Sequence, residues 1–160
     1  PPTDLSRATV LALRGMLSRD LALGNLGNIS LGDPGLLCDR LVEPDRGGYT
    51  AIVPHWQDQE RMLTLYPGSR FVNVMGYPMK ALQAIANAKA VISSSLHGIV
   101  LADAFGIPRM WDWFDGIQAQ GFKMYDYGTV VGTFEPGEWK TPNVFGLKKE
   151  LNECLSVSVS

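Results

Sequence analysis

The stretch "VISSSLHGIVLADAFGIP", Val91 to Pro108, contains the change of pattern that decides the fold. It begins with the β-branched residues typical of a buried strand, and it continues as an apolar segment long enough for a helix. Three serines and one of the two histidines of the chain lie where the two patterns meet. The stretch therefore predicts a strand, a polar junction and a helix that ends at the glycine and proline of "FGIP".

Short apolar strands alternate in the same way with helical patterns from the start of the chain to Phe114, and the pattern weakens after that residue. This alternation is typical of an α/β fold with a parallel sheet. We expect a three-layer α/β/α Rossmann-like lobe whose sheet is mainly parallel. One such domain covers residues 1–160, and residues 145–160 form its closing helix and tail. The expected inner strands are Thr9–Leu13, Ala51–Pro54, Phe71–Val74 and Val91–Ser93.

Composition excludes several classes of protein. The 160 residues are 46% hydrophobic with a net charge of −2 and no run of like charge, so we expect no nucleic-acid partner. Cys38 and Cys154 form no CxxC pair, and with two histidines they make no zinc site. No apolar run reaches the roughly 18 residues of a transmembrane helix. We expect a cytoplasmic protein, and because the chain opens on "PPTD" we expect it to be part of a longer one.

The junction after Val91–Ser93 is the predicted site, because parallel sheets bind ligands at the carboxyl ends of their strands. The first amides of a helix lack partners and carry a partial positive charge, which favours anions. His97 lies in that first turn and can give or take a proton near neutral pH. The alternative is a structural histidine, with one of the serines as an N-cap. The expected anion ligands are the amides of Leu96 and Gly98 and the hydroxyls of Ser93, Ser94 and Ser95.

Cations elsewhere are further candidates. Arg14 follows a predicted strand and can bind a carboxylate or phosphate through two nitrogens, or form an ion pair with Asp20 or Asp33. Lys80 and Lys123 are weaker candidates for the same task, since lysines are mostly solvated.

Several other side chains follow predicted strands or lie near the mouth of the site. His55 is a second candidate for proton transfer, and its alternative is packing beside the tryptophan that follows it. Asp103 lies on the apolar face of its helix and needs a partner; we expect a hydrogen bond to the "FGIP" loop, with sugar binding as the alternative. Trp111, Trp113 and Phe114 can stack on a sugar ring or pack in the core.

The central stretch, together with "LRGMLSRD" and "LGDPGLL", resembles the polysaccharide pyruvyl transferase family, most closely the bacterial exopolysaccharide ketal-pyruvate transferases. The resemblance implies the C-terminal lobe of a two-lobed protein similar to the GT-B glycosyltransferases, with the N-terminal lobe missing here. It implies transfer of the pyruvyl group of phosphoenolpyruvate to two sugar hydroxyls of an exopolysaccharide repeat unit, giving a cyclic ketal and phosphate without any further cofactor. By analogy the acceptor is lipid-linked, so the enzyme acts peripherally at the cytoplasmic face of the inner membrane.

The resemblance also assigns roles to residues. His97 stands at the acid/base histidine of the family, and Arg14 at the arginine of its "RG" motif, which binds the donor anion. Many members carry arginine two residues before the histidine, where this chain has Ser95. Either the helix N-terminus and the hydroxyls take over, or Arg70, Lys80 or Lys123 substitutes. Two other functions remain alternatives: a GT-B-type glycosyltransferase lobe that holds a nucleotide sugar, and a non-catalytic lobe that binds a sugar or an anion.

Overall fold

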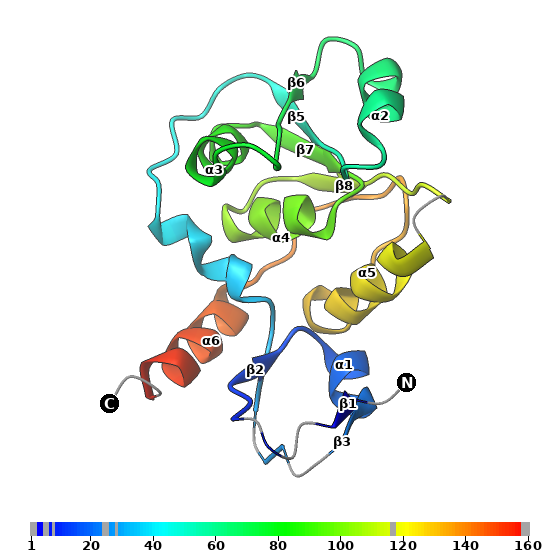
Figure 1. Cartoon of the computed structure of the whole chain (residues 1–160). Coiled ribbons are helices and arrows are strands. Elements are labelled where there is room, and N and C mark those ends of the chain that lie inside the picture. Colours follow the sequence, from blue (N-terminus) through cyan, green and yellow to red (C-terminus); the bar gives the residue numbers. More distant parts are fainter. Residues whose placement is uncertain are drawn as a thin grey trace.

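A five-stranded sheet in the order β6-β5-β7-β8-β9 forms the centre of the protein (Figure 1). The computed structural model describes residues 3–4, 7, 9–23, 26–27, 29–115 and 118–157. In the sheet, β6, β5, β7 and β8 run parallel, and β9 is antiparallel to β8. The mainly parallel sheet of the prediction is thus confirmed. Its strands are β5 (Thr50–Val53), β6 (Arg70–Phe71), β7 (Ala90–Ser93), β8 (Arg109–Trp111) and β9 (Trp139–Lys140).

Helices cover both faces of this sheet, because successive residues of a strand point to opposite sides. Ala51 and Val91 pack against α3 and α4, which lie in front of the sheet in Figure 1. Ile52 and Ile92 pack on the other side against Met62 of α2. The three-layer α/β/α lobe is therefore present. The helices are α1 (Met16–Leu21), the 3-10 helix η1 (Pro34–Arg40), α2 (Gln59–Leu65), α3 (Pro78–Ala86), α4 (Leu96–Ala104), α5 (Gln118–Val131) and α6 (Phe145–Val157).

Two of the predicted inner strands differ from the structure. The segment Thr9–Leu13 contributes β2 (Ala12–Leu13), which pairs with β4 (Ser30–Leu31) in a separate sheet, and Phe71–Val74 contributes only the end of the edge strand β6. Inner strands of a parallel sheet are buried on both faces, whereas Ala12 and Leu13 are half-buried. An apolar pattern predicts a strand but not its neighbours. A further pair joins β1 (Thr3–Asp4) to β3 (Ala22–Leu23).

A second core lies beside the first and joins α4 to the C-terminal helices. Met124 and Tyr127 of α5 pack with Trp111, and Leu151 of α6 packs with Leu36 of η1 in the same cluster. The closing helix is confirmed as α6, and residues 158–160 of its predicted tail lie outside the described residues. The sequence pattern did not predict α5, although that helix runs from the end of β8 toward α1 (Figure 1). No helix of the described residues is long and apolar enough to cross a membrane.

Candidate active site

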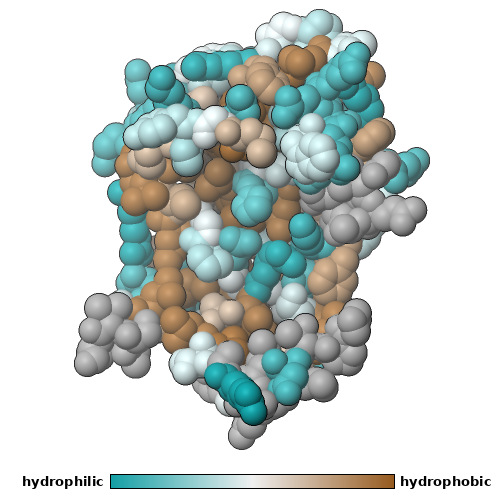
Figure 2. Space-filling model, viewed as in Figure 1, coloured by the Kyte–Doolittle hydropathy of each residue, from teal (hydrophilic) through white to brown (hydrophobic). Residues whose placement is uncertain are grey.

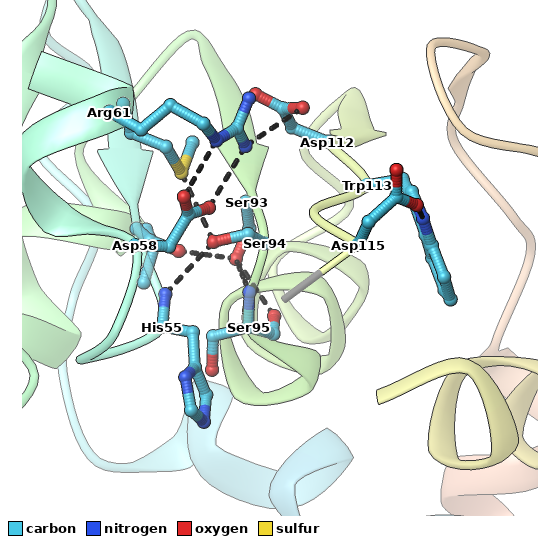
Figure 3. A network of polar contacts seen from close by, with 11 residues as sticks. His55, Asp58, Arg61, Ser93, Ser94, Ser95, Asp112, Trp113 and Asp115 are labelled. Carbon is cyan, nitrogen blue, oxygen red and sulfur yellow. Dashed lines mark hydrogen bonds and ion pairs between the residues drawn. The ribbon is translucent and has the colours of Figure 1, made fainter. Parts of the chain in front are cut away.

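The three serines at the end of β7 build the junction rather than line it. The Ser93 hydroxyl lies 2.6 Å from the Val53 carbonyl oxygen and accepts a hydrogen bond from the Ser95 amide at 3.0 Å. The Ser94 hydroxyl accepts one from the His55 amide at 3.0 Å, so β5 and β7 are joined at their ends (Figure 3). All three serines are buried. Ser95 is the N-cap residue of α4, but its side chain makes no capping hydrogen bond.

The helix after the junction packs very closely on the sheet. A Cβ atom at Gly98 would overlap the Ser93 hydroxyl and lie 2.8 Å from the Val53 Cβ atom. Only glycine permits this approach, so Gly98 brings the N-terminus of α4 onto the strand ends. The first-turn amides are thereby directed at the carboxyl edge of the sheet, where their partial positive charge favours an anion.

His97 is the exposed residue in an otherwise buried stretch from Val91 to Val100. Its backbone is in the first turn of α4, and its imidazole makes no hydrogen bond to any described residue. A helix buried on nearly all sides thus opens to solvent at one side chain, next to the strand ends. This placement leaves the imidazole able to exchange a proton with a ligand.

Arg14 pairs with neither of the carboxylates expected from the sequence. Its Nε atom lies 3.3 Å from Oδ2 of Asp126, a fully buried residue of α5. Asp20 is instead paired with its neighbour Arg19, and Asp33 accepts a hydrogen bond from the Gly35 amide at the start of η1. The predicted alternative of an ion pair with Asp20 or Asp33 is therefore wrong, because the partner comes from the helix that the pattern did not predict.

A network of two carboxylates and one arginine lies at the same edge and was not foreseen (Figure 3). Asp58 accepts hydrogen bonds from Arg61 Nε at 2.7 Å and Nη2 at 2.9 Å, and Asp112 lies 3.1 Å from Nη2. Burial and Asp112 raise the pKa of Tyr66 to about 12. The i, i+3 spacing of Asp58 and Arg61 was the available signal. Because two carboxylates already neutralise this guanidinium, Arg61 is a poor ligand for a further anion.

His55 and Lys123 lie close enough to interact electrostatically. Burial lowers the pKa of His55, the charge of Lys123 lowers it further, and Asp58 opposes the shift. The ring of His55 points away from the Asp58–Arg61 network in Figure 3, and its centroid is 5.8 Å from that of Trp56. α5 therefore brings a cation to the end of β5. Trp56 itself is 60% exposed.

The other two cations considered from the sequence, Arg70 and Lys80, differ in position. Arg70 begins β6 and stacks on Tyr49 with its guanidinium carbon 4.7 Å from the ring centroid. That position is the amino end of the parallel sheet, opposite the edge that carries His97. Lys80 is exposed in the first turn of α3, and its side chain has no partner among the described residues. Of the cations proposed to replace the missing arginine, Lys123 is the one whose charge lowers the pKa of His55, which follows β5.

Asp103 and Trp111 are structural. The Asp103 carboxylate accepts hydrogen bonds from Arg109 Nε at 3.0 Å and from the Tyr127 hydroxyl at 2.9 Å, and it is 1% exposed. Its partners thus lie on β8 and α5, rather than in the "FGIP" loop, and its burial leaves no room for a sugar. Trp111 is 1% exposed and belongs to the second core.

The two aromatic residues after β8 are half-buried. The Trp113 indole donates a hydrogen bond to Asp115, and Phe114 lies under the Arg61 guanidinium, 5.2 Å from its carbon to the ring centroid.

The turn "GDP" and helix α5 connect the sheet of β2 and β4 to the edge that carries His97. A Cβ atom at Gly35 would lie 2.9 Å from Cγ1 of Val100, so η1 packs against α4 one helical turn beyond His97. On the other side α5 contacts both α1 and α4. On the side of the molecule that Figure 1 shows, hydrophilic residues lie in the middle, with hydrophobic surface on either side (Figure 2).

Comparison with known proteins agrees with these features. A family model described as polysaccharide pyruvyl transferase matches residues 4–111, which is more than half of the chain. The chain belongs to the polysaccharide pyruvyl transferase family. An uncharacterized protein of Acanthamoeba polyphaga mimivirus is 31% identical over 120 residues, which cover 68% of this chain and 42% of that protein. The chain thus spans about two-fifths of the length of this relative. No solved structure matches.

The family match separates the site into two parts. It includes Arg14, Asp33 and His97, and it ends at Trp111. Helix α5, with Lys123 and Asp126, lies beyond it. In this member of the family, a side chain from outside the matched segment therefore lies against Arg14 within it.

Proposed function

We propose that the full-length protein transfers the pyruvyl group of phosphoenolpyruvate to two hydroxyls of a saccharide, and that this chain supplies the acid/base and donor-binding side of the site. The observation that carries the proposal is His97, an exposed imidazole in the first turn of a buried helix at the carboxyl edge of a parallel sheet. Membership of the family supports pyruvyl transfer, and the position of His97 supports proton transfer at an anion site.

The proposed reaction balances as follows. The two sugar oxygens bond to C2 of phosphoenolpyruvate, the bond between C2 and the phosphate oxygen breaks, and phosphate leaves. The methylene carbon C3 gains one proton and becomes a methyl group. Each sugar hydroxyl loses a proton, one of which balances the proton gained at C3 while the other leaves with phosphate. A group that moves protons beside C2 and C3 is therefore required, and a cationic environment is required for the carboxylate and phosphate of the donor.

We assign proton transfer to His97. We assign donor binding to the first-turn amides of α4 and to the cations Arg14 and Lys123. The first-turn amides of α4 face the strand ends, and no side chain of the described residues caps them. Arg14, whose side chain is 25% exposed, follows the end of β2. Lys123 is the cation that we propose in place of the arginine expected at Ser95, because its charge reaches His55 at the same edge. Lys80 remains a second candidate.

The acceptor is proposed to be a sugar of an exopolysaccharide repeat unit, carried on a lipid. This part of the proposal rests on the resemblance alone. The exposed Trp56, beside His55, offers an aromatic face on which a sugar ring can stack.

The test is turnover of phosphoenolpyruvate by the full-length protein. Phosphate release and the methyl signal of the cyclic ketal, followed by NMR, are measured with a panel of oligosaccharide acceptors. Parallel incubations with UDP-sugars test the glycosyltransferase alternative. Ketal formation that depends on both donor and acceptor supports the proposal. Transfer of sugar from a UDP-sugar, or binding without turnover of either donor, would contradict it.

A further inference from the structure

We propose that Asp126 of α5 is a positioning residue, which orients the guanidinium of Arg14 toward the anionic donor. The inference rests on the proposed function, since it concerns how Arg14 meets phosphoenolpyruvate. Asp126 lies outside the segment matched by the family model, so family membership assigns it no part in the reaction.

The geometry of Arg14 distinguishes the two ends of its guanidinium. Nε is shielded from solvent, lies 3.3 Å from Asp126 Oδ2, and forms no hydrogen bond there. The two Nη atoms have no partner among the described residues, and the side chain is 25% exposed. Arginine binds carboxylate or phosphate best through a pair of parallel N–H groups. With Asp126 at the Nε position, the Nη side remains open to the donor.

The carboxylate of Asp126 is itself held by α1. The Ser18 amide donates to Oδ1 at 2.9 Å, and the Ser18 hydroxyl donates to Oδ2 at 2.5 Å. Asp126 is fully buried, so it is shielded from competing water. Oδ2 thus lies between the Ser18 hydroxyl and Arg14. A carboxylate held in this way can keep the guanidinium in one orientation, which reduces the entropy lost when the donor binds.

Gly15 explains how α5 reaches this turn. A Cβ atom at Gly15 would overlap the Asp126 carbonyl oxygen and lie 2.6 Å from its carbonyl carbon. The glycine after Arg14 therefore admits the backbone of α5 to the place from which Asp126 meets the arginine. The pair "RG" combines the anion ligand with the residue that lets its positioning partner approach.

The alternative is that Asp126 only fastens α5 to α1. The same helix provides a matched control for this case. The Thr129 hydroxyl accepts a hydrogen bond from the Met16 amide at 2.8 Å and donates to the Asp126 carbonyl oxygen at 2.6 Å. It therefore fastens the same two helices without touching Arg14.

The experiment is a kinetic comparison of Asp126→Asn, Thr129→Val, Arg14→Lys and the double variant Asp126→Asn/Arg14→Lys in the full-length protein. We expect Asp126→Asn to raise KM for phosphoenolpyruvate about tenfold with kcat nearly unchanged. This is the size of one weakened charged hydrogen bond between Arg14 and the donor. Thr129→Val is expected to leave this KM unchanged. In the Arg14→Lys background, Asp126→Asn should have little further effect, since both changes act through the same contact.

Three results would overturn the inference. If KM for phosphoenolpyruvate is equal in Asp126→Asn and Thr129→Val, Asp126 only attaches α5 to α1. A lower KM would mean that Asp126 mainly neutralises Arg14. Additive effects in the double variant would separate the two residues. If Asp126→Asn does not fold, Ser18→Ala tests the same point: it should raise KM about two- to threefold, the effect of one lost hydrogen bond, and only where Arg14 is present. If the wild-type protein forms no ketal, the proposed function fails instead, and the inference falls with it.

Discussion

The protein has two strand-to-helix junctions, one in the central sheet and one in the sheet of β2 and β4, and they are built in different ways. At the β7–α4 junction, the contacts that shape the turn come from the turn itself and from the neighbouring strand β5: the Ser93 hydroxyl contacts Ser95 and Val53, and Gly98 packs on both Ser93 and Val53. At the β2–α1 junction, Arg14 and Ser18 are held by Asp126, more than a hundred residues along the chain. The first junction is therefore held by two neighbouring strands of the central sheet. The second depends on the docking of α5.

This difference suits the two junctions to different parts of the proposed reaction. A turn held by the central sheet suits the proton transfer that we propose for His97, because proton transfer needs a fixed geometry. A junction completed by a separate helix suits an anion ligand whose orientation is adjusted from outside. The following predictions test whether the two junctions differ in this way, in order of decreasing effect.

The largest expected effect is on turnover at the first junction. His97→Asn should keep the fold and lower kcat by roughly 10²-fold or more, the usual contribution of a general acid or base. Binding of phosphoenolpyruvate should fall much less, because the first-turn amides of α4 remain. Steady-state kinetics and calorimetric titration of the donor measure the two quantities. His55→Asn is the control, and a greater loss of kcat in that variant would move proton transfer to His55.

The second prediction contrasts the two close-packed glycines. Gly98→Ala should destabilise the lobe by about 1–3 kcal/mol, since a methyl group is forced into its core. Gly15→Ala should instead displace α5 and leave the central sheet in place. Thermal unfolding measures the first effect, and hydrogen exchange along α5 measures the second. Equal loss of exchange protection over sheet and helix in both variants would erase the distinction between the junctions.

The third prediction concerns the second junction alone. Arg14→Lys removes the planar arrangement of nitrogens but keeps the charge. We expect weaker use of phosphoenolpyruvate, by about 1–3 kcal/mol in kcat/KM, with normal folding by circular dichroism. Unchanged dependence on the donor would reduce Arg14 to a structural partner of Asp126.

The smallest expected effect is a change in the pKa of His55. This pKa reports where α5 lies relative to the end of β5. Burial and Lys123 hold the pKa of His55 below its ordinary value of 6.5. Lys123→Gln should therefore raise the pKa toward that value, and Lys80→Gln should not change it. NMR of the imidazole during a pH titration measures both. A pKa that does not respond to Lys123→Gln would place α5 away from this edge.

The sign of the accompanying stability change follows from linkage. Because the unfolded chain holds a proton on His55 more readily than the folded protein, acidification from just above 6.5 to the lowered pKa destabilises the fold. Lys123→Gln should reduce this loss, and the wild-type protein and the variant should differ least above pH 7.

How far the site could be foreseen depends on the distance between its partners in the chain. His97 was predicted from the spacing of one segment, because a buried strand followed by a buried helix leaves a polar first turn at a sheet edge. Asp58 and Arg61 lie three residues apart, yet Asp112, which completes their network, follows a different strand. Asp126 could not be predicted at all, since the apolar residues of its helix do not recur at a clear helical spacing.

The sequence by itself determined the α/β class, the strand and helix of Val91–Pro108, and the candidate acid/base residue. These features follow from local periodicity and from burial on both faces of an inner strand, which adjacent residues record. Tertiary structure alone decided that Ala12–Leu13 leaves the main sheet, that α5 closes against α1, and that Arg14 meets Asp126. Strand neighbours and buried ion pairs depend on which surfaces come together in space. That choice is made by the packing of the whole chain, and no short segment of sequence records it.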